Sequence, residues 1–461
     1  MGGFKKLAKD TALLTASSVL MRCIGLSYQV WLAGRIGAAG VGLWQLVLSV
    51  NVFTATLAIS GIRFTTTRLV AEELGLGNAG GVGAVIGRCL GYAMFFGGAS
   101  FLVQYLCAAP IGFLWVGDAR TVESLRVLAF SLPMISLSCV LNGYFIASGR
   151  AWKSAAVQVA EQAAGIGCVV YLLGRTAAGD TAACCAAIAW GTVAADGFSL
   201  ALIALLYLLD RRRSGRGDAG PDLTGRMLRI ALPLALAAYA RTGLTTLENL
   251  LVPRKLRAAG FSADRALAGY GTVTGMVFPI ISFPSCLLNA VAELTVPELT
   301  AAQVEGRQDR IDRSVSRLLR WTLIFALFCA AFLFLCAEPL GYLIYRTQGV
   351  GHYIRVLALL VPFMYMDIVT DGCLKGLGQM LWSMCFNIAE SLCGVALVFW
   401  LLPRWALRGY LFVLFFCELF NFTLSICRLR QVSRFRILPR FDGHFFRKKR
   451  ENACRDRRYP V

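Results

Sequence analysis

The sequence predicts an all-α polytopic membrane protein of about twelve transmembrane helices, arranged in two six-helix lobes that are related by a parallel internal repeat. Three observations predict this fold class: an apolar composition, a dozen long apolar stretches, and a similarity between the two halves of the chain. Hydrophobic residues make up 57% of the 461 residues. A soluble domain is nearer half apolar, so the excess indicates a protein that lies in lipid.

The apolar stretches account for most of the chain. A membrane-spanning helix needs roughly 20 predominantly apolar residues. The short basic N-terminus is not followed by a small-residue cleavage site, so we expect the first apolar stretch to be retained as a helix. The predicted spans lie at roughly 11–33, 43–64, 84–110, 125–147, 152–173, 184–208, 227–251, 267–291, 318–340, 354–373, 380–402 and 409–430.

Basic residues are distributed unevenly between the two sides of the predicted membrane. The formal net charge is +20, and 32 of the 46 Lys and Arg residues fall on segments that would share a side with the N-terminus, against 12 on the opposite loops. The positive-inside rule therefore predicts that both termini lie in the cytoplasm. We expect the basic tail, which includes Arg447–Arg450, to bind anionic lipid headgroups rather than nucleic acid.

Few residues are suited to catalysis or to metal binding. The 16 cysteines form no Cys-x-x-Cys pair, and most lie in apolar runs, where Cys behaves as a small hydrophobe. The two histidines, His352 and His444, fall in an outer loop and in the tail. We therefore expect no enzyme activity, no metal site, and no cofactor beyond a coupling ion.

An internal repeat relates the two halves. Arg126–Ala129 recurs as Arg355–Ala358 at an offset of 229, whereas the first helix follows an offset of 219 because about ten residues are inserted after the seventh span. Each half has an even number of spans, so the repeat is parallel and a site is expected between the lobes. The predicted division is a 1–209 N-terminal lobe, a 210–226 cytoplasmic linker, a 227–430 C-terminal lobe and a 431–461 basic tail.

Two arginines lie at equivalent depths in the membrane, where ionisable residues are functional candidates by default. Arg22 in the first span corresponds to Arg241 in the seventh, and two turns further on lie Gln29 and Glu248. A guanidinium presents a fork that fits phosphate, so we expect Arg22 and Arg241 to face a common binding region. The alternative is an ion pair within one lobe, such as Arg241 with Glu248.

Polar residues also repeat in the fifth and eleventh spans, where Gln158 and Glu161 correspond to Asn387 and Glu390. Such pairs serve either a site or a polar contact between helices. For Asp196 in the sixth span and Glu418 in the twelfth, we expect structural roles.

A carboxylate-and-amide site for Na⁺, or a proton relay, is predicted in the second lobe. Asp367 and Asp371 lie one turn apart in the tenth span, and Asp371 is expected to pair with Lys375. The predicted ion-coupling residues are Glu248, Asn249, Asp367, Asn387 and Glu390.

Four stretches carry a resemblance to a known family. They read ASSVLMRCIGLSYQVWLAGRIGAAGVGLWQL (16–46), SGIRFTTTRLVAEE (60–73), GYGTVTGMVFPIISFPSCLLNAVAELTVPELTAAQVEG (269–306) and TDGCLKGLGQMLWSMCFNIAE (370–390). The chain, nearly to Arg430, resembles the stage V sporulation protein B family of polysaccharide-biosynthesis transporters. That family is part of the multidrug/oligosaccharidyl-lipid/polysaccharide exporter superfamily, with the lipid II flippases and the multidrug and toxin extrusion proteins.

The resemblance implies a two-lobe fold that transports a lipid-linked oligosaccharide or peptidoglycan precursor across the cytoplasmic membrane. In the lipid II flippases, an arginine in a first-helix block like Met21–Gly25 lines the central cavity, which implies that role for Arg22. Those flippases have a further Arg–Asp pair where this chain has Tyr28 and Gln29, and this departure weakens the implication that lipid II itself is the substrate. The resemblance also implies a location in a bacterial cytoplasmic membrane.

The sequence therefore predicts a flippase that acts as a monomer. The predicted substrate-binding residues, which would hold the pyrophosphate and line the cavity, are Arg22, Arg63, Arg241 and Gln29. The alternative function is a Na⁺- or H⁺-coupled multidrug or metabolite antiporter of the same fold.

Overall fold

The computed structural model of the chain describes residues 2–76, 78, 80–176, 180–211, 223–346 and 349–435. The side chains of residues 2–19, 211, 293, 294, 297 and 304 are not part of this description. Most of the predicted linker and nearly all of the predicted basic tail, with Arg447–Arg450, lie outside the described residues.

The described chain is helical and contains no strand. This agrees with the predicted fold class, because a helix satisfies its own backbone polar groups where no water is present. The elements are α1 Gly2–Ile59, α2 Ile62–Gly75, α3 Gly81–Pro110, η1 Ile111–Val116, α4 Thr121–Ala129, α5 Ser131–Ala147, α6 Ala151–Leu173, α7 Thr181–Arg211, α8 Leu223–Ala258, α9 Ala263–Gly271, η2 Thr272–Val277, α10 Phe278–Ser282, α11 Ser285–Val304, α12 Gln308–Leu335, α13 Ala337–Tyr345, α14 Val350–Ala358, α15 Val361–Gly376 and α16 Met380–Val432.

The described helices account for the predicted number of membrane crossings. Eight helical segments are long and apolar enough to span a membrane, and two bent helix pairs raise this number to ten. The segments Leu20–Gly75 and Met380–Val432 contain 56 and 53 residues, which at 1.5 Å per residue is about 80 Å, well over twice a bilayer core of about 30 Å. Each is broken by a non-helical residue, Gly37 (φ 70°) and Ala406 (φ 49°). Each therefore holds two crossings, which gives the twelve that the sequence predicts.

The internal repeat is confirmed by the element bounds and by matching side-chain contacts. Helix α14 begins and ends 229 residues after α4, and α16 begins 229 residues after α6. Ser154 donates a hydrogen bond to Asn142 Oδ1 at 2.5 Å, and the equivalent Ser383 donates one to Asp371 Oδ1. The two halves therefore share their scaffold in detail.

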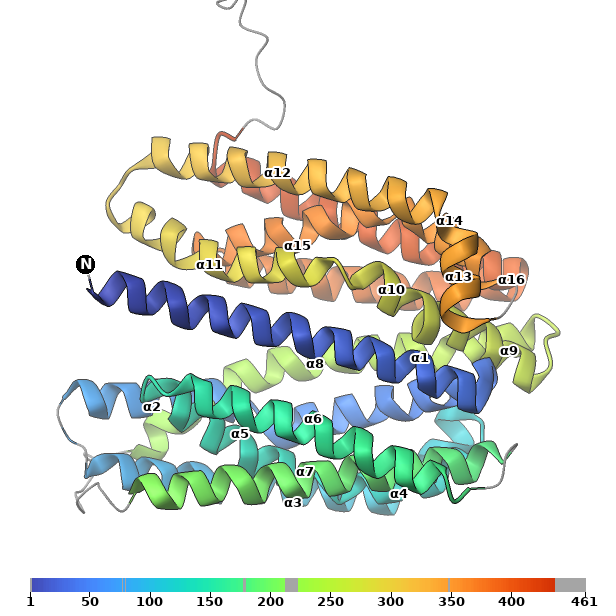
Figure 1. Ribbon diagram of the computed structural model, residues 1–461, viewed down its shortest axis with the longest axis horizontal. Coiled ribbons are helices and arrows are strands. Elements are labelled where there is room, and N and C mark those ends of the chain that lie inside the picture. The colour runs from blue at the N-terminus through green and yellow to red at the C-terminus, as the bar shows by residue number, and fades with distance from the viewer. Residues whose placement is uncertain are drawn as a thin grey trace, which may run out of the picture.

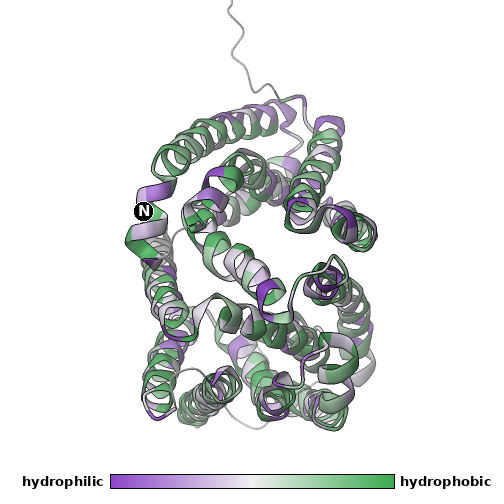
Figure 2. Cartoon of the chain, turned by 90° about the vertical axis from the view of Figure 1, so that its right-hand side faces the viewer, coloured by the Kyte–Doolittle hydropathy of each residue, from purple (hydrophilic) through white to green (hydrophobic). Residues whose placement is uncertain are grey.

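The helices form two bundles with α1 and α8 between them (Figure 1). Helices α2–α7 form the first lobe, and α9–α16 form the second. Figure 2, which looks at the right-hand end of Figure 1, shows that the outer faces of both bundles are largely apolar, as lipid requires.

Helix α8 packs in both lobes. Its first half contributes Met227 and Ala231 to the buried cluster of the first lobe. The backbone of Gly61, at φ +70°, approaches so closely that a Cβ there would lie 2.7 Å from the Ala231 carbonyl oxygen. The second half of α8 packs on α16, where Gly394 faces Glu248. The repeat assigns α8 to the second lobe, but its packing joins the two lobes.

We call the end of the molecule opposite the N-terminus of α1 the distal end; it includes residues 117–120 and 258–262. The two lobes approach each other most closely there. A Cβ at Gly42 would lie 2.1 Å from the Leu267 carbonyl oxygen, and one at Gly271 would lie 2.3 Å from the Ala38 carbonyl oxygen. Glycine at both positions is therefore required for α1 and α9 to touch through their backbones.

We expect Gly271→Ala to weaken this contact, because the added methyl group has no space. Overpacking of this kind costs about 1–3 kcal/mol. The measurement is the apparent melting temperature of the purified protein. Gly34→Ala in α1 is the matched control, since a Cβ there meets nothing within 4 Å. Equal melting temperatures for the two variants would contradict the close contact.

Charged groups also join the lobes at the distal end. Arg120 donates to Asp118 Oδ2 at 2.7 Å and to Asp264 Oδ1 of the second lobe at 3.0 Å. Arg257 Nη1 donates to the Gly117 carbonyl oxygen at 2.8 Å. Burial alone would raise the pKa of Asp118, but the hydrogen bonds and charge of Arg120, with the charge of Arg257, hold this pKa below its usual value.

The contribution of Asp118 should depend on pH. Because its pKa is lower in the folded protein, the carboxylate stabilises the fold above the unfolded-state pKa of about 4, and this contribution is lost as the pH falls through the folded-state pKa. We expect Asp118→Asn to cost about 1–3 kcal/mol at pH 7 and less in acid. Asp264→Asn should cost under about 1 kcal/mol, because Asp264 is 71% exposed and Asp118 only 8%. Melting curves at pH 7 and pH 3 measure the loss of stability in both variants, and equal losses for the two variants would contradict the predicted difference.

Candidate functional site

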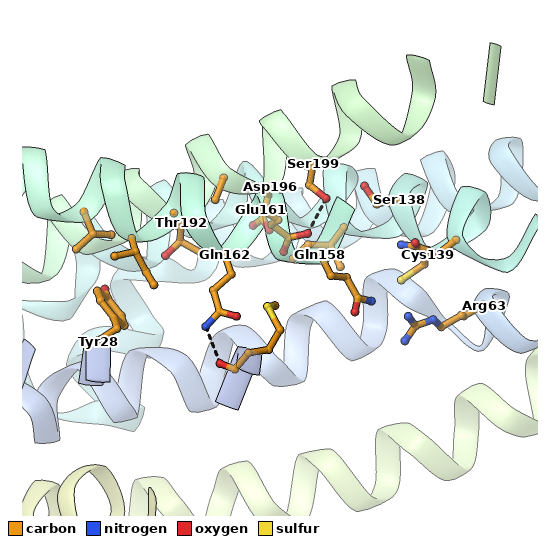
Figure 3. Close-up of a pocket in the computed structure, with 17 residues that line it drawn as sticks. Tyr28, Arg63, Ser138, Cys139, Gln158, Glu161, Gln162, Thr192, Asp196 and Ser199 are labelled. Atoms are coloured by element: carbon orange, nitrogen blue, oxygen red, sulfur yellow. Dashed lines mark hydrogen bonds between the residues drawn. The ribbon is translucent and has the colours of Figure 1, made fainter. Parts of the chain in front are cut away.

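The first lobe contains a polar cavity of about 570 Å³. It lies between the first two helices of the chain and α5, α6 and α7 (Figure 3). The sequence predicts a site between the lobes, but this cavity lies within one of them. Its lining consists of Met21, Tyr28, Arg63, Ile135, Ser138, Cys139, Asn142, Gln158, Glu161, Gln162, Gly165, Ile166, Val169, Thr192, Ala195, Asp196 and Ser199.

Arg63 supplies the cavity's guanidinium. It lies in the first turn of α2, directly after the break at Ser60 and Gly61. The Arg63 carbonyl oxygen packs against α5, where a Cβ at Gly143 would lie 3.0 Å from it. Its side chain and that of Gln158 point into the same space (Figure 3). Arg63 makes no ion pair within the described part of the chain, so its charge is available to a ligand.

Carboxylates and hydroxyls line the opposite wall. Ser199 Oγ donates to Glu161 Oε2 at 2.6 Å. Two other buried polar atoms, Asp196 Oδ2 and Ser138 Oγ, have no hydrogen-bond partner in the described structure. Because buried polar atoms are normally paired, these two are available to water or to a polar ligand.

The first helix borders the cavity but does not place every predicted residue there. Gln162 Nε2 donates to the Met21 carbonyl oxygen at 3.2 Å, which fixes α6 against α1. Arg22, the next residue, is exposed and does not line the cavity. Gln29 Nε2 donates to the Gly275 carbonyl oxygen of the second lobe at 2.9 Å. Of the predicted substrate-binding residues, the structure places Arg63 in the cavity and Arg22, Gln29 and Arg241 elsewhere.

The second lobe gathers four carboxylates, Glu248, Asp367, Glu390 and Glu418, which we call the acidic cluster. Glu390 interacts electrostatically with Asp367 and Glu248, and Glu418 interacts with Asp367 and Glu390. All four are partly buried. The carboxylate of Glu248 rests on Gly394, where a Cβ would lie 2.8 Å from Oε2. Three predicted ion-coupling residues are thus brought together, with Glu418 in addition.

Hydrogen bonds leave part of the acidic cluster unsatisfied. Asn421 Nδ2 donates to Asp367 Oδ2 at 3.0 Å, whereas the buried Asp367 Oδ1 has no hydrogen-bond partner among the described residues. The exposed Arg241 acts electrostatically on Glu390. An incoming proton or cation would therefore meet an unpaired carboxyl oxygen among four acidic side chains.

The predicted amide ligands have other partners. Asn249 Nδ2 donates to Ser49 Oγ of α1 at 3.2 Å, and Asn387 Nδ2 donates to the Ser383 carbonyl oxygen of its own helix at 2.7 Å. Asp371 pairs with Lys375 at 2.5 Å, as the sequence predicts. No group of three or more His, Cys, Asp or Glu residues suited to a metal ion occurs within the described ranges.

Sequence reasoning missed three polar residues of these sites. Asn142 lines the cavity and is related to Asp371 by the repeat offset, a signal that could have identified it. Gln162 corresponds to Ser391 in the repeat, so no matching amide or acid pointed to it. Asn421, which holds Asp367, is far from it in the sequence, so only the fold brings the two together.

Comparison with known proteins supports the predicted resemblance. Residues 256–400 match the MatE family model. The chain is 22% identical over 403 residues to stage V sporulation protein B of Bacillus subtilis (strain 168), covering 86% of this chain and 78% of that protein. It is 29% identical over 187 residues to a probable lipid II flippase MurJ of Rhizobium meliloti (strain 1021), covering 38% of this chain and 32% of that protein.

A solved structure has the same fold. The inward-facing conformation of a multidrug resistance MATE family transporter of the MOP superfamily superimposes with a TM-score of 0.67 at 16% identity, covering 91% of this chain and 98% of that one. The chain is therefore homologous to stage V sporulation protein B, which confirms the resemblance seen in the sequence, and it shares the multi-pass fold of this MATE family transporter.

Proposed function

We propose that this protein is a membrane transporter, and specifically a flippase that moves a lipid-linked oligosaccharide or peptidoglycan precursor across the cytoplasmic membrane. The observation that carries the proposal is the first-lobe cavity, where the unpaired guanidinium of Arg63 faces amides, hydroxyls and carboxylates. A guanidinium binds a phosphate group through paired hydrogen bonds. Amides and carboxylates are suited to the hydroxyl groups of a sugar.

The size of the cavity supports a head group of this kind. About 570 Å³ falls within the range of roughly 300–1,000 Å³ that is typical of small-molecule sites. The cavity lies inside a lobe with an apolar outer face (Figure 2), so a polar head could occupy it while its hydrocarbon tail stays in lipid. The name of one relative, a probable lipid II flippase, agrees with this substrate class.

The acidic cluster favours ion coupling, which we include in the proposal. Binding or release of H⁺, or binding of Na⁺, would change the charge of the acidic cluster and so change how α8 packs on α16. A cation-coupled antiporter of drugs or metabolites is the second candidate, and this cluster is the observation that favours it. The uneven distribution of basic residues supports a cytoplasmic location for both termini in either case.

Replacing Arg63 tests the phosphate role. We expect Arg63→Ala to reduce flipping of a defined lipid-linked substrate by about tenfold or more, since a lost charge-assisted hydrogen bond is worth about 1.5–3 kcal/mol. Arg63→Lys should retain part of the activity, because it keeps the charge but not the fork. The assay uses protein reconstituted in vesicles.

Arg68→Ala is the matched control, because Arg68 pairs with Glu72 on the same helix at 3.0 Å and does not line the cavity. It should flip substrate like the unmodified protein. Arg22→Ala tests the role that the resemblance implies. Undiminished flipping by the folded Arg63→Ala protein would refute the head-group site, and export of organic cations by the same vesicles would favour the antiporter.

Replacing Glu248 tests ion coupling separately. We expect Glu248→Gln to abolish the dependence of transport on an imposed H⁺ or Na⁺ gradient, because the neutral side chain keeps the shape of the site without its charge. Glu338→Gln is the control, since Glu338 is 55% exposed and pairs only with Arg355 at 3.7 Å. Transport by Glu248→Gln that still follows the gradient would exclude Glu248 as a coupling residue.

A further inference from the structure

A second cavity, of about 530 Å³, lies in the second lobe at the distal end. It is formed by α9, the start of α14 and the bend in α16, and it is distinct from the first-lobe cavity and from the acidic cluster. Its polar and aromatic lining consists of Phe261, Arg265, Thr272, His352, Tyr353, Trp405 and Arg408, and the Arg265 guanidinium lies 5.2 Å from the centre of the Phe261 ring.

The charge of this cavity is unbalanced. Arg265 and Arg408 are exposed and form no ion pair within the described residues, and no described carboxylate lines the cavity. The nearby acidic residues have other partners: Asp264 accepts from Arg120 at 3.0 Å, and Glu338 pairs with Arg355 at 3.7 Å. Two guanidinium groups that share one cavity without a counter-ion attract an anion.

A strained backbone shapes the cavity. Ala406 has φ 49° and ψ −131°, a left-handed conformation that alanine rarely adopts and that costs of order 1–3 kcal/mol. The break reverses α16 between Trp405 and Arg408, so that both side chains line the same cavity. Strain of this kind persists where the surrounding structure requires it, and it is common at ligand sites.

Aromatic residues beside the cavity indicate the membrane surface. Trp405 is 57% exposed, and Trp400, one helical turn before it, is 61% exposed. The guanidinium of Arg404 stacks on the Trp400 ring at 4.3 Å. Exposed tryptophan near the end of a spanning helix is typical of the layer where lipid headgroups lie.

We propose that this cavity is a phosphate-binding site, and that Arg265 and Arg408 hold the phosphate while Trp405 and Tyr353 contact the group that carries it. Its position at the headgroup layer favours the phosphodiester of an anionic lipid over a soluble phosphate. The proposal does not depend on the first-lobe cavity, because the two cavities share no residue. It also does not depend on the direction of transport.

The test measures binding to the purified full-length protein in a detergent micelle. The probes are dihexanoyl phosphatidylglycerol, dihexanoyl phosphatidylcholine and inorganic phosphate, each titrated while the apparent melting temperature is followed, since a ligand that binds the folded state stabilises it. We expect phosphatidylglycerol to stabilise the protein more than phosphatidylcholine. We also expect Arg265→Gln and Arg408→Gln each to weaken its binding about tenfold, which corresponds to about 1.4 kcal/mol.

Arg404→Gln is the matched control, because it removes the same charge from the same bend, outside the cavity lining. It should bind phosphatidylglycerol like the unmodified protein. Stabilisation by inorganic phosphate that equals that by phosphatidylglycerol, and that is lost in the same two variants, would support the site but assign it to a soluble phosphate. Equal titrations for the unmodified protein, Arg265→Gln and Arg408→Gln would overturn the proposal.

Discussion

The absence of water from the bilayer core is the constraint on which the rest of the structure depends. A charged side chain that faces lipid is costly, so such groups are turned toward a protein interior or a wet cavity. Glu161 and Asp196 accordingly face the first-lobe cavity, and the acidic cluster lies among α8, α15 and α16. The same constraint keeps the lipid-facing surfaces apolar (Figure 2). Each lobe is thus an apolar shell around its own polar interior.

The repeat explains how two similar lobes come to have different polar interiors. The scaffold contact from Ser154 to Asn142 recurs as the contact from Ser383 to Asp371, so the backbone frame is shared. At the position of Arg63 the second lobe has Ala292. Of the acidic cluster, only Glu390 has an acidic counterpart, Glu161, so the second lobe adds the other three carboxyl groups. A cation that lines one cavity suits an anionic head group, whereas gathered carboxylates suit a cation. Divergence of a few side chains on one frame is enough to separate the two tasks.

The sequence predicted the twelve crossings and the repeat, because both depend on apolar length and on the spacing of residues along the chain. It predicted the site residues less completely, because the direction in which a helix turns each side chain depends on tertiary packing. Gln29 turns to the carbonyl oxygen of Gly275, and Asn249 turns to Ser49. The sequence predicted the membrane depth of both residues but did not predict their hydrogen-bond partners. The predicted spans 380–402 and 409–430 place a turn around Ala406, but the cavity beside this turn depends on how α9 and α14 pack against it and was not predictable.

Helix α8 connects the polar chemistry of the second lobe to the position of the first. Its first half is fixed in the first lobe by Met227 and Ala231, and its second half carries Glu248 against Gly394 of α16. A change in the charge of Glu248 therefore acts on a helix that both lobes hold. At the distal end, the lobes touch through the backbones of Gly42 and Gly271. No side chain of these two residues lies between the backbones that could change rotamer as the lobes move. Packed interfaces of this kind tend to be bistable rather than continuously deformable, so a shift of α8 would favour separation of the lobes at that contact over gradual bending.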